Sequence, residues 1–198
     1  MDIGAHVGYY AIHAAKVVGP TGHVFAFEPV PSNLRRLEEN AALNGFSNLT
    51  SVASAVGNRT GKATFRAVDV PGESGWGSLL LDPASNTKDL EVSVVSLDDF
   101  AEQHGVTRVD VLKLDVQGGE FDVLTGAGKI LDAWHPTIVC EVTDVYWGSA
   151  QTTTAKDLFE YLAGREYEPW VIGTRGRLTR LDDAGSAPQN LLFRFRRD

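Results

Sequence analysis

The sequence of 198 residues contains a single cysteine, Cys140, which excludes an intramolecular disulfide and a cysteine-rich zinc site. Basic residues are also scarce, because 18 Lys and Arg stand against 26 Asp and Glu, for a formal net charge of −8. Binding to nucleic acid or to an anionic membrane depends on clustered basic residues. We therefore expect neither as the main partner of this protein.

Long apolar runs are missing as well. No segment approaches the roughly 18 apolar residues that a membrane-spanning helix needs. The N-terminus, Met1-Asp2-Ile3-Gly4, has neither the basic region nor the apolar core of a secretion leader. These absences predict a cytoplasmic protein. With 43% hydrophobic and 22% charged residues and no repeat or Pro-rich linker, the composition is that of a globular chain, and its length predicts one domain over 1–198.

Short apolar segments alternate with helical patterns along most of the chain. Strands are expected as a short stub at 3–4 and at 23–27, 49–56, 109–115, 136–142, 167–172 and 191–195, with helices that include 9–18 and 120–131. Such alternation predicts an α/β fold, a doubly wound and mostly parallel sheet, with an antiparallel edge near the C-terminus. Residues 57–95 interrupt the pattern with two strand-like segments, which predicts a hairpin-like excursion within the single domain.

Acidic residues stand at the carboxyl ends of four expected strands, which is where doubly wound sheets bind ligands. They are Asp2, Glu28, Asp115 and Glu141, and Asp144 follows shortly after the last of them. Each acid by itself could simply cap the helix that follows it. The set as a whole favours a ligand crevice.

The loop at 2–8 places glycines in the pattern G-x-x-x-G, not in the G-x-G-x-x-G of dinucleotide-binding folds. Gly4 permits a sharp turn, and Gly8 permits close approach of a helix or a ligand. Glu28 comes 20 residues after Gly8, at the end of the second strand. A carboxylate at that place can accept both ribose hydroxyls, so the loop and the acid together predict a nucleoside ligand.

Three segments resemble the signature blocks of FkbM-type S-adenosylmethionine-dependent methyltransferases. They are DIGAHVGYY at 2–10, FEPVPSN at 27–33 and LKLDVQGGE at 112–120. The resemblance implies a class I methyltransferase fold and methylation of an oxygen on a small molecule or sugar. It further implies that the first block holds the methionine part of the cofactor, that the acid of the second holds the ribose, and that the acid of the third lies near the reacting centre.

This sequence departs from the family pattern at three positions. His6 replaces the usual Asn, Gln117 the usual Glu, and Gly119 the usual Ala. We expect cofactor binding to survive these changes. The chain also starts directly before the first block, so we expect a truncated first strand, and either a homo-oligomer whose partner covers this edge or a monomer of low stability that the cofactor stabilises.

Residue types, strand ends and the resemblance together yield a set of predicted site residues. The predicted cofactor-binding residues are Asp2, Gly4, Ala5, His6, Gly8, Tyr9, Glu28, Pro29, Asn33, Ser54, Ala55 and Asp115. Ser54 and Ala55 are expected beside the adenine, because the third strand ends there. Asp115 is the predicted general base, and Glu120 and Lys113 are further catalytic candidates. Because Lys113 lies in an apolar strand, we also expect it to pair with a carboxylate.

Two further hypotheses concern the surroundings of this site. One hypothesis is a bound Mg²⁺ ion, because Asp115, Glu141 and Asp144 offer the oxygen ligands that this ion prefers. Trp76 and Trp147 are candidate walls of the pocket.

The favoured function is that of an O-methyltransferase with a small-molecule acceptor. The alternatives are a non-catalytic or truncated cofactor-binding module and a nucleotide-dependent oxidoreductase. The absence of G-x-G-x-x-G counts against the oxidoreductase.

Overall fold

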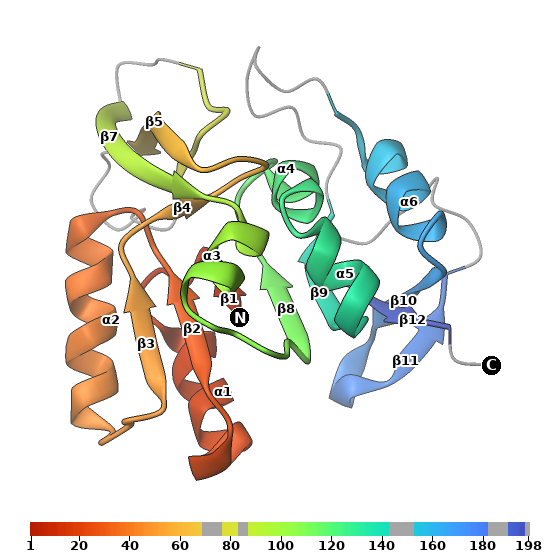
Figure 1. Ribbon diagram of the computed structural model, residues 1–198, viewed down its shortest axis with the longest axis horizontal. Coiled ribbons are helices and arrows are strands. Elements are labelled where there is room, and N and C mark those ends of the chain that lie inside the picture. The colour runs from red at the N-terminus through yellow and green to blue at the C-terminus, as the bar shows by residue number, and fades with distance from the viewer. Residues whose placement is uncertain (69–76, 83–86, 143–152, 182–189, 197–198) are drawn as a thin grey trace.

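The computed structural model describes residues 1–68, 77–82, 87–142, 153–181 and 190–196 (Figure 1). Over these residues the α-helices are α1 (Tyr9–Val18), α2 (Pro31–Leu43), α3 (Leu97–Gln103), α4 (Glu120–Thr125), α5 (Gly128–Trp134) and α6 (Ala155–Ala163), with 3₁₀ turns η1 (Gly19–Thr21) and η2 (Thr174–Gly176). None of the helices in this part of the chain is long and apolar enough to cross a membrane.

A large sheet forms the centre of the fold, with strand order β11-β10-β12-β9-β8-β1-β2-β3. Its strands are β1 (Asp2–Ile3), β2 (Val24–Phe27), β3 (Leu49–Val52), β8 (Val111–Leu114), β9 (Thr137–Glu141), β10 (Tyr167–Ile172), β11 (Leu178–Arg180) and β12 (Asn190–Phe195). The strands from β9 to β3 are parallel, whereas β12 is antiparallel to both neighbours and β11 to β10. The predicted α/β class, its antiparallel edge and the short first strand are confirmed.

Side chains of β2 alternate between the two faces of this sheet, because successive residues of a strand point to opposite sides. Val24 and Ala26 pack on one face with Leu37 of α2. Phe27 points to the other face, where its ring lies 4.8 Å from that of Phe100 of α3. Helices therefore cover both faces, with α1 behind the sheet and α3 in front of it in Figure 1.

A smaller sheet stands beyond the carboxyl ends of β2, β3 and β8 (Figure 1). Its order in the described residues is β4-β7-β5-β6, formed by β4 (Ala55–Val56), β5 (Gly61–Val68), β6 (Gly77–Ser78) and β7 (Thr87–Val95). β5 and β7 pair antiparallel along their length, from Gly61 opposite Val94 to Val68 opposite Thr87. The assignment of the whole chain to one domain stays a prediction.

The strand expected at 49–56 is divided between the two sheets. β3 ends at Val52, and the N–H of Ser54 donates to the carbonyl oxygen of Val52 at 2.9 Å, which closes a tight turn. β4 then begins at Ala55 and pairs with β7 of the smaller sheet. Apolar alternation continues across this turn, so the sequence pattern did not mark the change of sheet.

The single helix expected at 120–131 is also divided, into α4 and α5. The break falls at Gly126, where any Cβ would overlap the carbonyl oxygen of Gly57. The carboxylate of Asp98 then accepts the N–H groups of Lys129 and Ile130, at 2.9 and 3.1 Å, and so satisfies the first turn of α5. The break therefore coincides with a close contact from outside the segment, which the periodicity of the segment does not reveal.

Candidate active site

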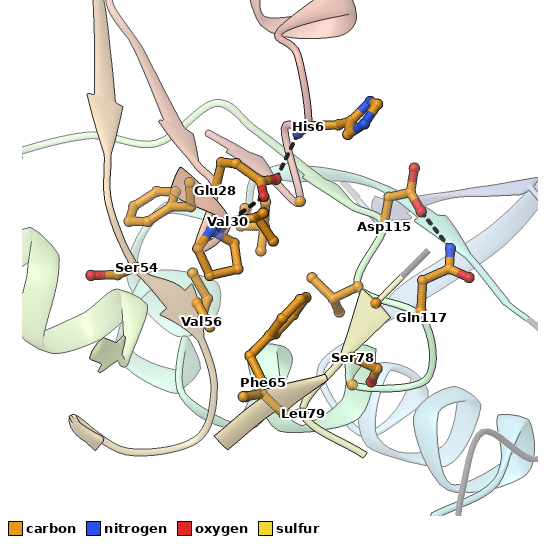
Figure 2. Close-up of a pocket in the computed structure, with 18 of the residues that line it drawn as sticks. His6, Glu28, Val30, Ser54, Val56, Phe65, Ser78, Leu79, Asp115 and Gln117 are labelled. Atoms are coloured by element: carbon orange, nitrogen blue, oxygen red, sulfur yellow. Dashed lines mark hydrogen bonds between the residues drawn. The ribbon is translucent and has the colours of Figure 1, made fainter. Parts of the chain in front are cut away.

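A cavity of about 380 Å³ lies where the carboxyl edge of the large sheet meets the smaller sheet (Figure 2). Glu28, Asp115 and Glu141 line it from the large sheet, as expected for acids at the ends of parallel strands. Phe65 and Leu79 line it from the smaller sheet. An apolar wall opposite a few polar groups is the usual form of a small-molecule site.

The loop between β1 and α1 fits against this edge because Gly4 has no side chain. Gly4 has a φ of 78°, and a Cβ there would overlap the main-chain oxygen of Asp115. The N–H groups of Gly4 and Ala5 donate to the carbonyl oxygen of Phe27, at 3.1 and 2.9 Å. The first loop is thereby fixed to the ends of β2 and β8, the two neighbours of β1.

Glu28 is buried and held almost entirely by the main chain. Its Oε2 accepts the N–H of His6 at 2.9 Å, and its Oε1 accepts the N–H of Val30 at 2.9 Å (Figure 2). The side-chain amide of Asn33 donates to Oε1 at 3.3 Å. Burial raises the pKa of Glu28, whereas these donors act in the opposite direction. The carboxylate is therefore fixed in place before any ligand arrives.

Lys113 pairs with carboxylates, as predicted. Its Nζ lies 3.1 Å from Asp2 Oδ1 and 3.4 Å from Asp115 Oδ2. Asp2 is buried, and burial raises its pKa despite the neighbouring ammonium. Lys113 is not among the residues that line the cavity. Lys113 therefore holds Asp2 and Asp115 in place, and its position gives no support to a catalytic role.

A side-chain amide joins the two acids at the other end of the cavity. Nε2 of Gln117 donates to Asp115 Oδ1 at 3.0 Å and to Glu141 Oε2 at 3.2 Å. Gln117 has a φ of 54°, a left-handed conformation that costs about 1–2 kcal/mol for a residue with a side chain. Burial and the charge of Asp115 both raise the pKa of Glu141. Strain of this kind persists only where the surroundings enforce it.

Glu120 requires a correction, because it does not line this cavity. Its carboxylate turns into the loop before α4, where Oε1 accepts the N–H of Val116 at 3.0 Å and Oε2 accepts that of Gly118 at 2.9 Å. Burial raises the pKa of Glu120 to about 7. Both oxygens are thus engaged by the main chain, and Glu120 shapes the loop that carries Gln117.

The predicted cofactor-binding residues divide into two groups. Those that line the cavity are Gly4, His6, Glu28, Pro29, Asn33, Ser54, Ala55 and Asp115. Asp2, Ala5, Gly8 and Tyr9 do not, and Tyr9 is 65% exposed on the start of α1. Asp2 lies in β1, and Ala5 and Gly8 belong to the loop that follows it, whereas Tyr9 faces solvent.

Sequence reasoning missed the wall that the smaller sheet contributes. Phe65 of β5, Ser78 of β6 and Leu79 after it line the cavity, and Gly77 leaves the room that the Phe65 ring occupies. Local patterns predicted strands here, but nothing in them indicated that β5 lines the same cavity as the first loop. Trp76 and Trp147, the expected aromatic walls, lie outside the described residues.

The predicted metal ligands are only partly described. Asp115 and Glu141 both line the cavity, whereas Asp144 lies outside the described residues. Among the residues that the structure does describe, no group of three His, Cys, Asp or Glu side chains could hold a metal ion. A magnesium ion at this place stays a hypothesis.

Sequence comparison identifies one family and several relatives. The family described as "Methyltransferase FkbM domain" matches residues 2–169. The AMB antimetabolite synthetase AmbE of Pseudomonas aeruginosa is 29% identical over an alignment of 178 residues, and the match covers 73% of this chain but 8% of that protein. The hexuronic acid methyltransferase AglP of Haloferax volcanii is 25% identical over 180 residues, covering 88% of this chain and 69% of that protein.

Among solved structures, the chain resembles the methyltransferase FkbM from Methylobacillus flagellatus, with a TM-score of 0.59 at 20% identity. The match covers 97% of this chain and 42% of that one. The sequence described here therefore corresponds to less than half of that chain and to a small part of AmbE.

Proposed function

This chain belongs to the FkbM methyltransferase family, and we propose that it transfers a methyl group from S-adenosylmethionine to a hydroxyl oxygen of a neutral small molecule or sugar. The observation that carries the proposal is a single cavity with two differently built ends. The donor end consists of His6, Glu28, Val30 and Asn33, and the acceptor end of Asp115, Gln117 and Glu141. This arrangement suits two ligands that meet in one space.

The donor end fits a nucleoside. Glu28 presents a fixed carboxylate at the end of β2, the place from which an acid accepts ribose hydroxyls. Ser54 and Ala55 border the same space from the turn after β3, so the adenine would lie against them. When bound, S-adenosylmethionine supplies an electrophilic methyl group on a sulfonium sulfur.

The acceptor end fits a hydroxyl group. Carboxylates only accept hydrogen bonds when ionised, so Asp115 and Glu141 favour ligands that donate O–H groups. Two negative groups in one cavity also disfavour an anionic acceptor. AglP is named a hexuronic acid methyltransferase, and a sugar acceptor here would present its hydroxyls, not a carboxylate, to this end.

The proposal also includes the binding partners of the protein and a requirement for Mg²⁺. The net charge of −8 supports a small-molecule acceptor over nucleic acid or a membrane surface. A homo-oligomer covering the edge near β1 is an additional prediction. A requirement for Mg²⁺ at Asp115 and Glu141 is the finer hypothesis, tested by comparing turnover with and without a chelator.

The test measures binding and transfer separately. Calorimetry with S-adenosylmethionine and with S-adenosylhomocysteine should show binding, and Glu28→Gln should weaken it about ten- to hundredfold, since a charge-assisted hydrogen bond contributes about 1.5–3 kcal/mol. Glu38→Gln, an exposed carboxylate bonded to the Ser51 hydroxyl, is the matched control and should leave affinity unchanged.

Transfer is then assayed with tritiated cofactor and methyl glucoside, methyl fucoside, catechol and glucuronate. Labelling of a neutral acceptor supports the proposal. Binding without transfer to any acceptor would favour a non-catalytic module, and binding of NADH in preference to S-adenosylmethionine would favour an oxidoreductase.

A further inference from the structure

The smaller sheet places an aromatic side chain between the two ends of the cavity. In Figure 2 the ring of Phe65 lies between Val56 and Ser78. Val56 is on the side of Glu28 and the donor end, and Ser78 is on the side of Gln117 and the acceptor end. We propose that Phe65 is the specificity-determining residue for the acceptor, and that the acceptor is a pyranose whose C–H face lies on this ring. The inference rests on the proposed methyl transfer and narrows the class of its acceptor.

The register of the smaller sheet separates Phe65 from the place expected for the adenine. Ala55 of β4 pairs with Val94 of β7, whereas Phe65 of β5 pairs with Leu90 of β7. Phe65 is therefore two strands across the sheet from Ala55, about 10 Å, and four residues away along β7, about 13 Å. A phenylalanine ring at this separation does not stack on an adenine that lies against Ala55. Phe65 is thus left for the second ligand.

The half-buried ring of Phe65 is fixed by its neighbours. A Cβ at Gly77 would lie 2.7 Å from Cε1 and 2.9 Å from Cζ of Phe65, so the edge of the ring occupies the room that a side chain at 77 would need. Nη1 of Arg66 donates to the carbonyl oxygen of Leu81 at 2.8 Å, which ties β5 to the segment after β6. A side chain that is already fixed loses little conformational entropy when a ligand binds to it.

A pyranose matches both walls of the cavity. Hydroxyl groups surround the edge of its ring, whereas C–H groups make its faces apolar. Oxygens of Asp115 and Glu141 accept hydrogen bonds, and the amide nitrogen of Gln117 donates to both, at 3.0 and 3.2 Å, which keeps them near enough for neighbouring hydroxyls. Phe65 and Leu79 form the apolar wall, which removes C–H surface from water. A phenol shares the flat face but has few hydroxyls for two acids, and it is the competing acceptor in the test.

The experiment replaces Phe65 and measures each ligand separately. Phe65→Leu should lower kcat/KM for methyl glucoside or methyl fucoside, whichever is labelled, about tenfold and mainly through KM, because the stacking surface is lost. Phe65→Tyr keeps the ring and should restore most of this loss. The affinity for S-adenosylhomocysteine, measured by calorimetry, should stay unchanged in both variants. A loss of that affinity as large as the rise in KM would make Phe65 part of the donor end and overturn the proposal.

Gly77→Ala tests whether the position of the ring matters. Its Cβ would displace the Phe65 ring, so this variant should also raise the KM of the pyranoside. Leucine has neither Cε1 nor Cζ, so the same change in a Phe65→Leu background should add little to the effect of Phe65→Leu alone. Effects that multiply fully in the double variant would show that Gly77 acts independently of the ring, and would contradict the proposal.

The matched control is Phe159→Leu. Phe159 is a half-buried residue of α6 whose ring lies 5.5 Å from that of Phe193, and it does not line the cavity. This variant removes the same atoms as Phe65→Leu and should keep the wild-type KM and kcat. An equal rise in KM in both variants would show a general loss of packing and overturn the role of Phe65.

A second readout needs no turnover. In protein whose phenylalanine rings alone carry protons, with S-adenosylhomocysteine bound, saturation of the ring protons should reach the C–H protons of one face of methyl glucoside. Phe65→Leu should remove this transfer. Unchanged transfer in the variant, or methylation of catechol but of no pyranoside, would overturn the proposal while leaving methyl transfer intact. Absence of methylation of every acceptor by the wild type would instead refute the proposed function, and this proposal with it.

Discussion

The carboxylates at the two ends of the cavity are held in place by different kinds of hydrogen-bond donor. At the donor end, Glu28 is held by main-chain N–H groups of His6 and Val30. At the acceptor end, Asp115 and Glu141 are held by the side chain of Gln117. Main-chain donors are fixed by the fold itself, whereas side-chain donors change with one substitution. A side-chain substitution therefore leaves the main-chain donors to Glu28 in place. A substitution of Gln117, by contrast, removes the donor shared by Asp115 and Glu141.

The strongest test of this contrast is Gly4→Ala at the donor end. A Cβ at Gly4 would overlap the main-chain oxygen of Asp115, in a backbone with a φ of 78°. The combined cost of backbone strain and overpacking should lower the free energy of unfolding by roughly 2–5 kcal/mol, measured by urea denaturation. Gly45→Ala is the matched control, because Gly45 has a φ of 67° but open space around it. Equal losses in the two variants would show that the first loop is not fixed by close contact.

A smaller effect is expected from Glu120→Gln behind the acceptor end. The Gln amide can accept only one of the N–H groups of Val116 and Gly118. The free energy of unfolding of the variant should therefore be about 1–3 kcal/mol below that of the wild type at pH 5. Because burial raises the pKa of Glu120 to about 7, the folded wild type holds a proton that the unfolded chain releases above its ordinary pKa of 4.5. Wild-type stability therefore falls as pH rises through this window, by up to roughly 3 kcal/mol.

The difference in melting temperature between wild type and Glu120→Gln should accordingly narrow between pH 5 and pH 8. Glu102→Gln, an exposed residue of α3 paired with Lys129, controls for the loss of a surface charge and should show no such narrowing. A constant difference across this range would mean that Glu120 is ionised throughout, and that the loop is held by a permanent carboxylate.

The smallest change in stability should follow Gln117→Gly. Glycine removes the left-handed strain of about 1–2 kcal/mol but adds entropy to the unfolded chain, at a cost of about 0.5–1 kcal/mol. The free energy of unfolding should shift by less than about 1 kcal/mol in a urea titration. Glu166→Gly, at an exposed residue with a φ of 62°, reports the backbone effect alone. A loss above about 2 kcal/mol at Gln117 alone would show that its amide supports the fold as well as the site.

The sequence by itself determined the sheet and the position of its polar ends. The alternation of apolar segments and helical patterns predicted the α/β class, and acids at strand ends predicted the edge at which Glu28, Asp115 and Glu141 line a cavity. The pairing of Lys113 with carboxylates was predictable too, because an ammonium in an apolar strand needs a counter-charge. Each of these inferences depends on a local pattern or on a rule that holds for all parallel sheets.

Only the tertiary structure decided what closes the cavity and how its acids are partnered. Phe65 and Leu79 reach the site because the smaller sheet stands over the carboxyl edge, and residue 126 after α4 must be glycine because the main chain of Gly57 lies against it. Glu120, the last residue of the third block, was a catalytic candidate, yet its oxygens accept main-chain N–H groups of the adjacent loop. Sequence periodicity shows which residues are buried. It does not show which distant segment buries them or supplies a hydrogen-bond donor. These long-range contacts determine the chemistry of each acid.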